Sequence, residues 1–149
     1  MEQRFETFTI QIAKISRYIR KIKTEEMAEF NLKSPHVSCL YYLYQKDGEM
    51  TATDLCEVSN EDKAAISRSI DFLENNGYIK CESKTEKRYK SPLFLTEKGR
   101  TVAVKITDKV DNIVNIASAD MTMEERKKFY KNLTAICNNL RKICDNYEE

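Results

Sequence analysis

The stretch from residue 51 to residue 100 constrains the fold most, because four segments follow one another there in a characteristic order. Residues 51–58 form a short helix pattern, and a polar break separates them from a longer helix pattern over residues 61–76. A glycine follows this second pattern, as is common after the last turn of a helix. Two short apolar runs, 78–81 and 91–95, then flank a polar, basic tip. The sequence therefore predicts two helices joined by a turn, followed by a two-stranded hairpin.

This order of elements is typical of a winged helix-turn-helix, in which the second helix enters the major groove of DNA and the hairpin tip lies on the flanking backbone. Five apolar residues at helix-core spacing should hold the two helices at a fixed angle. They are Leu55, Val58, Ile66, Ile70 and Leu73.

The outward face of the second helix carries short polar and basic residues, which we expect to contact DNA. They are Asn60, Lys63, Ala64, Ser67 and Arg68. Short side chains near a helix N-terminus allow close approach to phosphates, and an arginine can bind guanine with two hydrogen bonds. The alternative is an ordinary solvated face, which Glu61 and Asp62 favour, although acids also suit the first turn of a helix.

The hairpin tip between Lys80 and Lys90 holds five basic residues against two acidic ones. A solvated hairpin would also be charged, but next to a helix-turn-helix this charge predicts a DNA-binding wing. The residues expected to contact DNA there are Lys84, Lys87, Arg88 and Lys90.

The order and the residues of these segments resemble those of the MarR family of bacterial transcription regulators. The resemblance rests on Ser67-Arg68, on the run from Ile70 to Ile79 and on the run from Leu95 to Arg100. It implies six helices, a wing and a dimer built from both ends of the chain. Glu86-Lys87-Arg88 occupies the place of the family's Asp-Arg-Arg wing motif, but Arg88 stands seven residues before Leu95, one more than is usual.

Long helices are predicted at both ends of the chain, each with an apolar stripe at spacings of three and four residues. Thr122 and Glu125 form the capping box that opens the last helix. The stripes could pack on each other within one chain, but their length favours helices from two chains that interleave into a shared hub. The residues expected in this hub are Phe8, Ile12, Ile15, Ile19, Leu133, Ile136, Leu140 and Ile143.

The predicted fold class is therefore mostly α (α+β): a winged helix-turn-helix with N- and C-terminal dimerisation helices. We expect a single domain over residues 1–149, in which 34–100 read DNA and 1–30 and 101–149 form the hub. A further helix should begin at Ser34-Pro35, and another should cover 101–118.

The resemblance also implies regulation by a small aromatic or phenolic effector, or by oxidation of a thiol. The hinge is the region between the DNA-reading part and the hub, and its candidate effector residues are Arg17, Arg20, His36, Tyr41 and Tyr44. His36, the one histidine, is expected to cap a helix or to be solvated rather than to bind a metal. The five cysteines, Cys39, Cys56, Cys81, Cys137 and Cys144, include no close pair and indicate neither a disulfide framework nor a zinc site. Inert thiols are the expectation for Cys39 and Cys81, and no metal or cofactor is expected.

A formal net charge of +1 requires any DNA contact to come from local clusters of basic residues. We expect a cytoplasmic protein, because no apolar run reaches the length of about 18 residues that a membrane helix needs. No phosphate-binding glycine loop or nucleophile–base pattern indicates an enzyme. The predicted function is a sequence-specific regulator of transcription that binds a pseudo-palindromic operator in double-stranded DNA, as a repressor released by an effector. The alternative is a winged-helix adaptor dimer that does not bind DNA.

Overall fold

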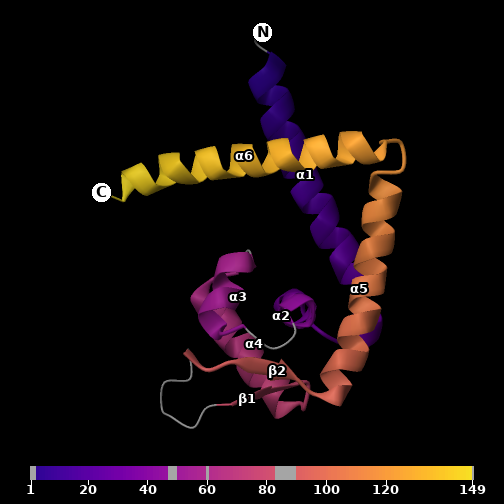
Figure 1. The fold of residues 1–149 in the computed structure, drawn as a ribbon, viewed down its shortest axis with the longest axis vertical. Helices are drawn as coiled ribbons and strands as arrows, with labels where there is room; N and C mark the ends of the chain where they lie inside the picture. The colour runs from indigo at the N-terminus through magenta and orange to yellow at the C-terminus, as the bar shows by residue number, and fades with distance from the viewer. Residues whose placement is uncertain (1–2, 47–49, 60, 83–89, 149) are drawn as a thin grey trace. The chain divides into compact units, whose positions relative to one another are not determined.

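The computed structural model of the chain describes residues 3–46, 50–59, 61–82 and 90–148. Two compact units are present, Met1–Lys109 and Val110–Glu149. The elements, in chain order, are α1 (Gln3–Glu26), the 3-10 turn η1 (Ala28–Phe30), α2 (Ser34–Lys46), α3 (Ala52–Val58), α4 (Lys63–Asn75), β1 (Ile79–Cys81), β2 (Leu93–Leu95), α5 (Glu97–Ala117) and α6 (Met123–Tyr147) (Figure 1). The predicted class is confirmed: the described residues form α-helices and a two-stranded sheet, in the order of a winged helix-turn-helix.

The core of the first unit lies where α2, α3 and α4 meet the small sheet (Figure 1). Its largest fully buried side chains come from all of these elements and from α5. They are Leu40, Leu43, Leu55, Ile66, Leu73, Ile79, Leu93 and Ile106. The expectation that Val58 belongs to this core is wrong, because its side chain is 42% exposed. Val58 is the last residue of α3, and the backbone turns to an extended conformation at Ser59.

The two strands are antiparallel, with Ile79 opposite Leu95 and Cys81 opposite Leu93. A further backbone contact, which the sequence analysis did not predict, joins β2 to the residue before the Thr51 cap of α3. The Leu93 amide donates to the Met50 carbonyl oxygen at 2.8 Å. β2, at the base of the wing, is therefore hydrogen-bonded to the start of the helix-turn-helix as well as to β1.

α5 begins at Glu97, four residues earlier than the sequence analysis predicted. The Gly99 amide donates to the Thr96 hydroxyl at 3.1 Å, and the Arg100 amide donates to the Thr96 carbonyl at 2.8 Å. Thr96 therefore caps the helix, and the residues from Glu97 to Arg100, which the sequence analysis placed at the end of the wing, form its first turn.

Further along α5, the Lys109 ammonium pairs with Glu26 at 3.3 Å and with Glu29 at 2.8 Å. These ion pairs join α5 to the end of α1 and to η1.

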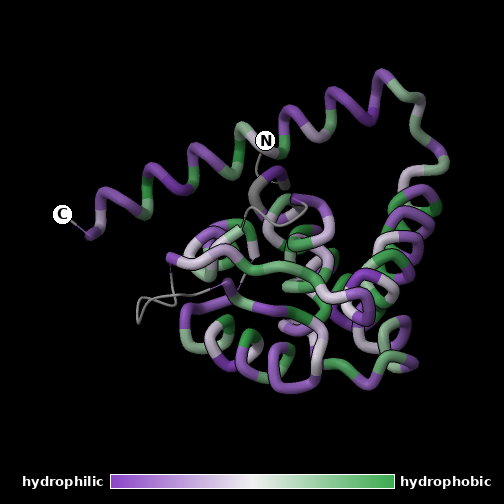
Figure 2. Tube along the Cα trace, turned by 60° about the horizontal axis from the view of Figure 1, so that its bottom comes forward, coloured by the Kyte–Doolittle hydropathy of each residue, from purple (hydrophilic) through white to green (hydrophobic). Residues whose placement is uncertain are grey.

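α1 and α6 each carry their apolar stripe at the surface. The predicted capping box of α6 is confirmed, since Thr122 and Glu125 exchange both hydrogen bonds, and none of the residues of α6 is buried. Hydrophobic positions recur along the α6 tube at regular intervals (Figure 2). Among the described residues, no helix is long and apolar enough to cross a membrane.

Candidate nucleic-acid interface

α4 begins at Lys63, two residues later than the sequence predicted, because Asp62 is its cap rather than part of the helix. An Asp62 carboxylate oxygen accepts the Ala65 amide at 2.7 Å, and the Asp62 backbone is extended. Lys63 thus becomes the first helical residue, at the end of the helix where unpaired amides concentrate positive charge. Asp62, whose charge favoured an ordinary solvated face in the sequence analysis, therefore has a structural role as the cap of α4.

One side of α4 is buried and the opposite side is exposed. Ile66, Ser69, Ile70 and Leu73 face the core. Four of the five predicted recognition residues lie on the exposed side, and we call them the reading face: Lys63, Ala64, Ser67 and Arg68. Their spacing of one and four residues places them together on the first two turns of the helix. The fifth, Asn60, lies outside the described residues.

The reading face carries small side chains at its centre and basic side chains at its edges. Ala64 and Ser67 leave the helix backbone accessible, while Lys63 and Arg68 provide the positive charge. Such a surface can approach an anionic polymer closely and offer it both amide dipoles and cationic donors. Ser69, on the buried side, donates its hydroxyl to the Ala65 carbonyl at 2.8 Å, so its burial leaves no polar atom unpaired.

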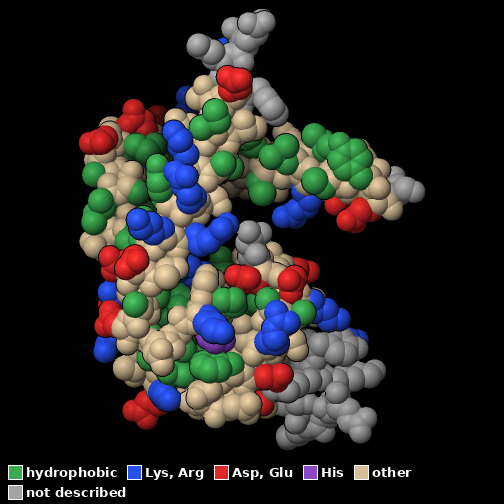
Figure 3. Space-filling view, turned by 180° about the vertical axis from the view of Figure 1, so that it is seen from behind, with side chains coloured by type: hydrophobic (Ala, Val, Ile, Leu, Met, Phe, Trp, Pro, Cys, Tyr) green, Lys and Arg blue, Asp and Glu red, His purple; other side chains and the backbone are tan. Residues whose placement is uncertain are grey.

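α4 is also held against α2 by an aromatic contact that the sequence analysis missed. The rings of His36 and Phe72 are stacked, with their centroids 4.1 Å apart and their planes 4° from parallel. His36 Nδ1 accepts the Lys33 amide at 3.1 Å, so the histidine caps the start of α2, one of its two predicted roles, and is buried rather than solvated. Burial, assisted by the nearby Lys33, lowers the pKa of His36 below its ordinary value and favours the neutral ring. In Figure 3 the histidine is visible as a purple patch among basic and hydrophobic side chains.

A second link, between α1 and α2, passes through Lys23. Its ammonium donates to the Ser38 hydroxyl. Burial lowers the pKa of Lys23, and the nearby Glu61, just ahead of α4, opposes that shift. The helical pattern of α1 does not predict this contact, because a lysine outside the apolar stripe is expected to be solvated.

The wing is described only at its base. Lys80 is exposed on β1 and Lys90 is exposed before β2. The other predicted wing residues, Lys84, Lys87 and Arg88, lie outside the described residues, so the register of Arg88 remains a prediction.

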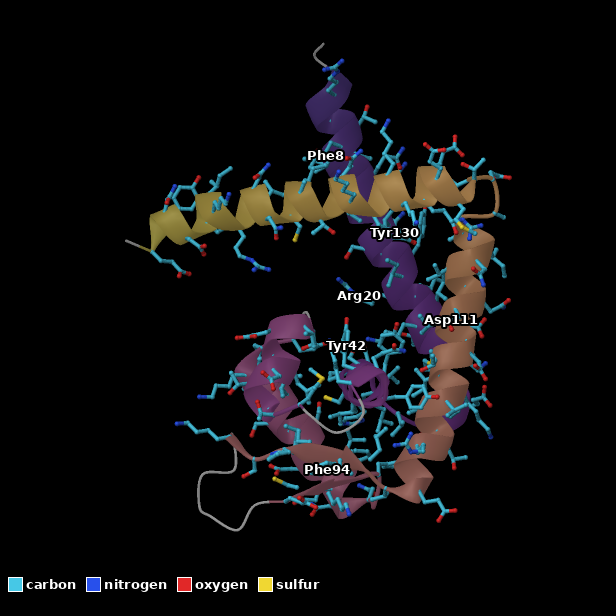
Figure 4. All side chains as sticks on the ribbon, in the orientation of Figure 1. Phe8, Arg20, Tyr42, Phe94, Asp111 and Tyr130 are labelled. Carbon is cyan, nitrogen blue, oxygen red and sulfur yellow. The ribbon has the colours of Figure 1, made fainter. Side chains whose placement is uncertain are left out.

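The candidate effector residues are all part of the first unit, but they lie in different settings. Arg17 stands over the ring of Tyr18, with its guanidinium carbon 5.3 Å from the centroid, and Arg100 stands over Tyr44 at 5.9 Å. Tyr41 meets Tyr42 edge to face. Figure 4 shows Tyr42, which the sequence analysis did not single out, projecting from α2 toward the part of α1 that carries Arg20. His36 is engaged by Phe72 instead.

All five cysteines have free thiols. Cys39 is buried, and burial raises the pKa of its thiol to about 12, so the thiol is protonated at neutral pH. Cys56 and Cys81 are half-buried, and Cys137 and Cys144 are exposed on α6. Within the ranges that the structure describes, no group of three or more His, Cys, Asp or Glu side chains could hold a metal ion.

Residues 36–114 match the family model of the winged helix DNA-binding domain. The chain is also 29% identical over 119 residues to an uncharacterised helix-turn-helix transcriptional regulator, YwoH, of Bacillus subtilis, covering 80% of this chain and 85% of that one.

Solved structures give the same picture of the fold. A MarR family regulator from Neisseria meningitidis superposes with a TM-score of 0.81 at 20% identity, covering 95% of this chain and 96% of that one. A protein described as a MarR family transcriptional regulator, from Listeria monocytogenes and complexed with a 26mer DNA, superposes with a TM-score of 0.78 at 25% identity, covering 89% and 87% of the two chains.

Proposed function

The chain belongs to the winged helix DNA-binding domain family, and we propose on that basis that it is a sequence-specific regulator of transcription that binds double-stranded DNA as a homodimer. It also has the fold of MarR family regulators, as its sequence resemblance predicted. The observation that carries the proposal is the reading face: four exposed, short or basic residues on a helix whose other side is buried. The DNA bound to the Listeria relative supports a duplex as the partner.

In the proposed mechanism, α4 enters the major groove and the reading face meets the bases and phosphates. Arg68 donates to a guanine edge or to a phosphate, and Ala64 and Ser67 let the backbone approach. The wing, with Lys84, Lys87, Arg88 and Lys90, lies on the flanking backbone, where Arg88 fits a narrow minor groove. Residues 34–100 make up this DNA-reading part.

The homodimer is proposed because the apolar stripes of α1 and α6 lie at the surface. Ile12, Ile15, Leu133 and Ile136 are between 36% and 47% exposed, and Ile19, Leu140 and Ile143 are between 49% and 59% exposed. Isolated apolar stripes of this length are rarely left in water. Residues 1–30 and 101–149 of two chains would cover them in a shared hub and present two reading faces to a pseudo-palindromic operator.

We further propose that the protein acts as a repressor that a small aromatic or phenolic effector releases from its operator. Arg17, Arg20, Tyr41 and Tyr44 offer a cation and ring faces of the kind that such a ligand uses. Binding there would favour a dimer geometry that no longer matches the separation of the two half-sites.

Selection of bound fragments from a genomic pool, followed by footprinting, tests the central claim. We expect one enriched sequence with two half-sites about one helical turn, ~34–36 Å, apart. A variant with alanine at Lys63, Ser67 and Arg68 should keep its circular dichroism spectrum and enrich nothing. If the wild type enriches no sequence, the chain is better described as an adaptor dimer that does not bind DNA. If the variant enriches the same sequence as the wild type, the protein binds DNA through a face other than the reading face.

A further inference from the structure

The first turn of α5 is bonded to the backbone that ends α4. The Thr96 cap and two residues of that turn, Lys98 and Gly99, reach the segment from Asn76 to Tyr78, which follows the last helical residue of α4. We call these three residues the clamp. Each makes its contact through a different physical interaction.

Thr96 uses its backbone amide and its hydroxyl group. Its amide donates to the Tyr78 carbonyl at 3.0 Å. Its hydroxyl lies within hydrogen-bond distance of the Gly77 and Tyr78 carbonyl oxygens and accepts the Gly99 amide at 3.1 Å. The cap of α5 is thus bonded to the turn that terminates α4.

Gly99 brings the two backbones into direct contact. A Cβ atom built at Gly99 would lie 1.9 Å from the Tyr78 carbonyl oxygen, far inside van der Waals distance. Gly77 has a φ of +77°, a left-handed conformation that reverses the chain after α4. This reversal places the Tyr78 carbonyl against α5.

Lys98 adds a charged contact from the solvent side. Its ammonium donates to the Asn76 carbonyl at 2.8 Å and lies 4.2 Å from the centre of the Tyr78 ring. The carbonyl belongs to the C-cap of α4, where the helix dipole attracts a cation. The ring face attracts the same cation.

We propose that Lys98 is a positioning residue for DNA recognition: through the clamp it fixes the C-terminal end of α4 and thereby the angle of the reading face. The proposal rests on the DNA-binding function given above. α5 is continuous from Glu97 to Ala117, so the clamp also ties the start of this long helix to the end of the recognition helix. A displacement of α5 therefore reaches α4 through backbone contacts.

Lys98 is suited to a clean test because it is exposed. Its replacement by methionine keeps the length of the side chain, removes the charge and leaves no buried polar group unpaired. Lys98→Arg keeps a cation that can donate to Asn76 and stack on Tyr78. Lys105→Met removes the same charge from an exposed position about two turns further along α5.

Operator binding and binding to an unrelated duplex are measured for the wild type and these variants over a range of salt concentrations. We expect Lys98→Met to weaken operator binding about tenfold, because losing a charged hydrogen bond and its ring contact lowers the fraction of free protein in which α4 holds the angle that binds DNA. Binding to the unrelated duplex and the salt slope should stay unchanged, and Lys98→Arg and Lys105→Met should bind the operator like the wild type. A parallel loss on both duplexes, with a salt slope lower by about one, would mean that Lys98 contacts a phosphate and would overturn the proposal. Unchanged operator binding would also overturn it.

Amide hydrogen exchange without DNA separates this proposal from the function on which it rests. The Gly77 and Tyr78 amides donate to the Glu74 and Leu73 carbonyls, so they report on the end of α4. Lys98→Met should accelerate their exchange, while exchange in the middle of α4 stays slow. If the wild type selects no operator but this acceleration occurs, the DNA-binding function is wrong and the clamp stands. If exchange at Gly77 and Tyr78 does not change, the clamp is wrong whatever the protein binds.

Discussion

His36 and Phe72 face each other ring to ring, 4.1 Å apart, and so join the first turn of α2 to the recognition helix. His36 can keep this place only as a neutral ring, because its Nδ1 accepts the Lys33 amide and must carry a lone pair. Protonation would turn an acceptor into a donor opposite another donor. The placement of α4 is therefore linked to pH.

The pH dependence of stability tests this link. The pKa of His36 is lowered in the folded chain, mainly by burial, so below the ordinary value of 6.5 the unfolded chain binds more protons than the folded chain. The contribution of His36 to the free energy of unfolding is full above pH 6.5 and falls as the pH drops toward the lowered pKa. Between about pH 7.5 and 5.5, the melting temperature of the wild type should fall more than that of His36→Phe, which keeps a stacked neutral ring. Equal falls in both proteins would contradict the link.

The two glycines that flank the end of α4 and the start of α5 should differ in their response to alanine. Gly99→Ala should cost roughly 3 kcal/mol or more, because the new Cβ meets the Tyr78 carbonyl backbone. Gly77→Ala should cost about 1 kcal/mol, since it strains a left-handed residue but meets no atom within 4 Å. Urea unfolding of both variants gives the comparison, and a larger loss at Gly77 would refute the close approach.

Charged substitutions in the terminal stripes test the hub. Ile12→Asp combined with Leu140→Asp should give an aggregated or unfolded chain, because the shared interface is expected to bury well over ~2,000 Å² and to be needed for folding. Asn138→Asp, at an exposed polar position of α6, should leave a folded dimer. Sedimentation and circular dichroism distinguish these results. A soluble, folded monomer from the double variant would show that the shared hub is not needed for folding.

Arg68 and Lys84 should affect DNA binding in different ways. Arg68→Ala should cost about 1–3 kcal/mol and relax the base preference at one position in each half-site. Lys84→Ala should weaken binding to all sequences alike and reduce the salt slope by about one. The measurement is the affinity for the selected operator and for single-base variants of it. If Arg68→Ala binds the operator as tightly as the wild type does, α4 reads DNA with another face.

An effector that releases the protein from its operator must bind the free dimer and the DNA-bound dimer with different affinities. A ligand that weakens operator binding about tenfold must itself bind the DNA-bound dimer about tenfold more weakly than the free dimer. Titration of aromatic acids and phenols against both forms, by calorimetry, measures the two constants. A releasing ligand with equal affinity for both would remove the hinge mechanism and leave thiol oxidation as the next candidate.

Periodicity and turn residues were enough to predict most of the module. The buried side of α4, the positions of the strands and the capping box of α6 all follow from local rules of spacing and hydrogen bonding. Thr96 shows where such rules fail. Its bonds to Gly99 and Arg100, which cap α5, are local. Its bonds to the carbonyls of Gly77 and Tyr78, almost twenty residues earlier, do not follow from spacing along the chain.

The missed residues share this dependence on distant partners. Lys23, Phe72 and Lys98 sit at positions that a helical pattern marks as solvated or ordinary, and their contacts are with Ser38, His36 and Asn76. Val58 fails for the opposite reason: its spacing suits the core, but α3 ends at that residue. Single-sequence reasoning has no access to where a helix stops relative to its neighbours.

The hydrogen bond from Leu93 to Met50 has a consequence for how the chain folds. It joins two residues that enclose both helices of the helix-turn-helix, and β1 pairs with residues up to Leu95. Contacts between distant parts of a chain form after local ones, because closing the loop costs entropy before the contact stabilises it. On a ribosome, α2, α3 and α4 can begin to form early, but the module is incomplete until Leu95 has emerged. The second strand is therefore the element that finishes the DNA-reading part during synthesis.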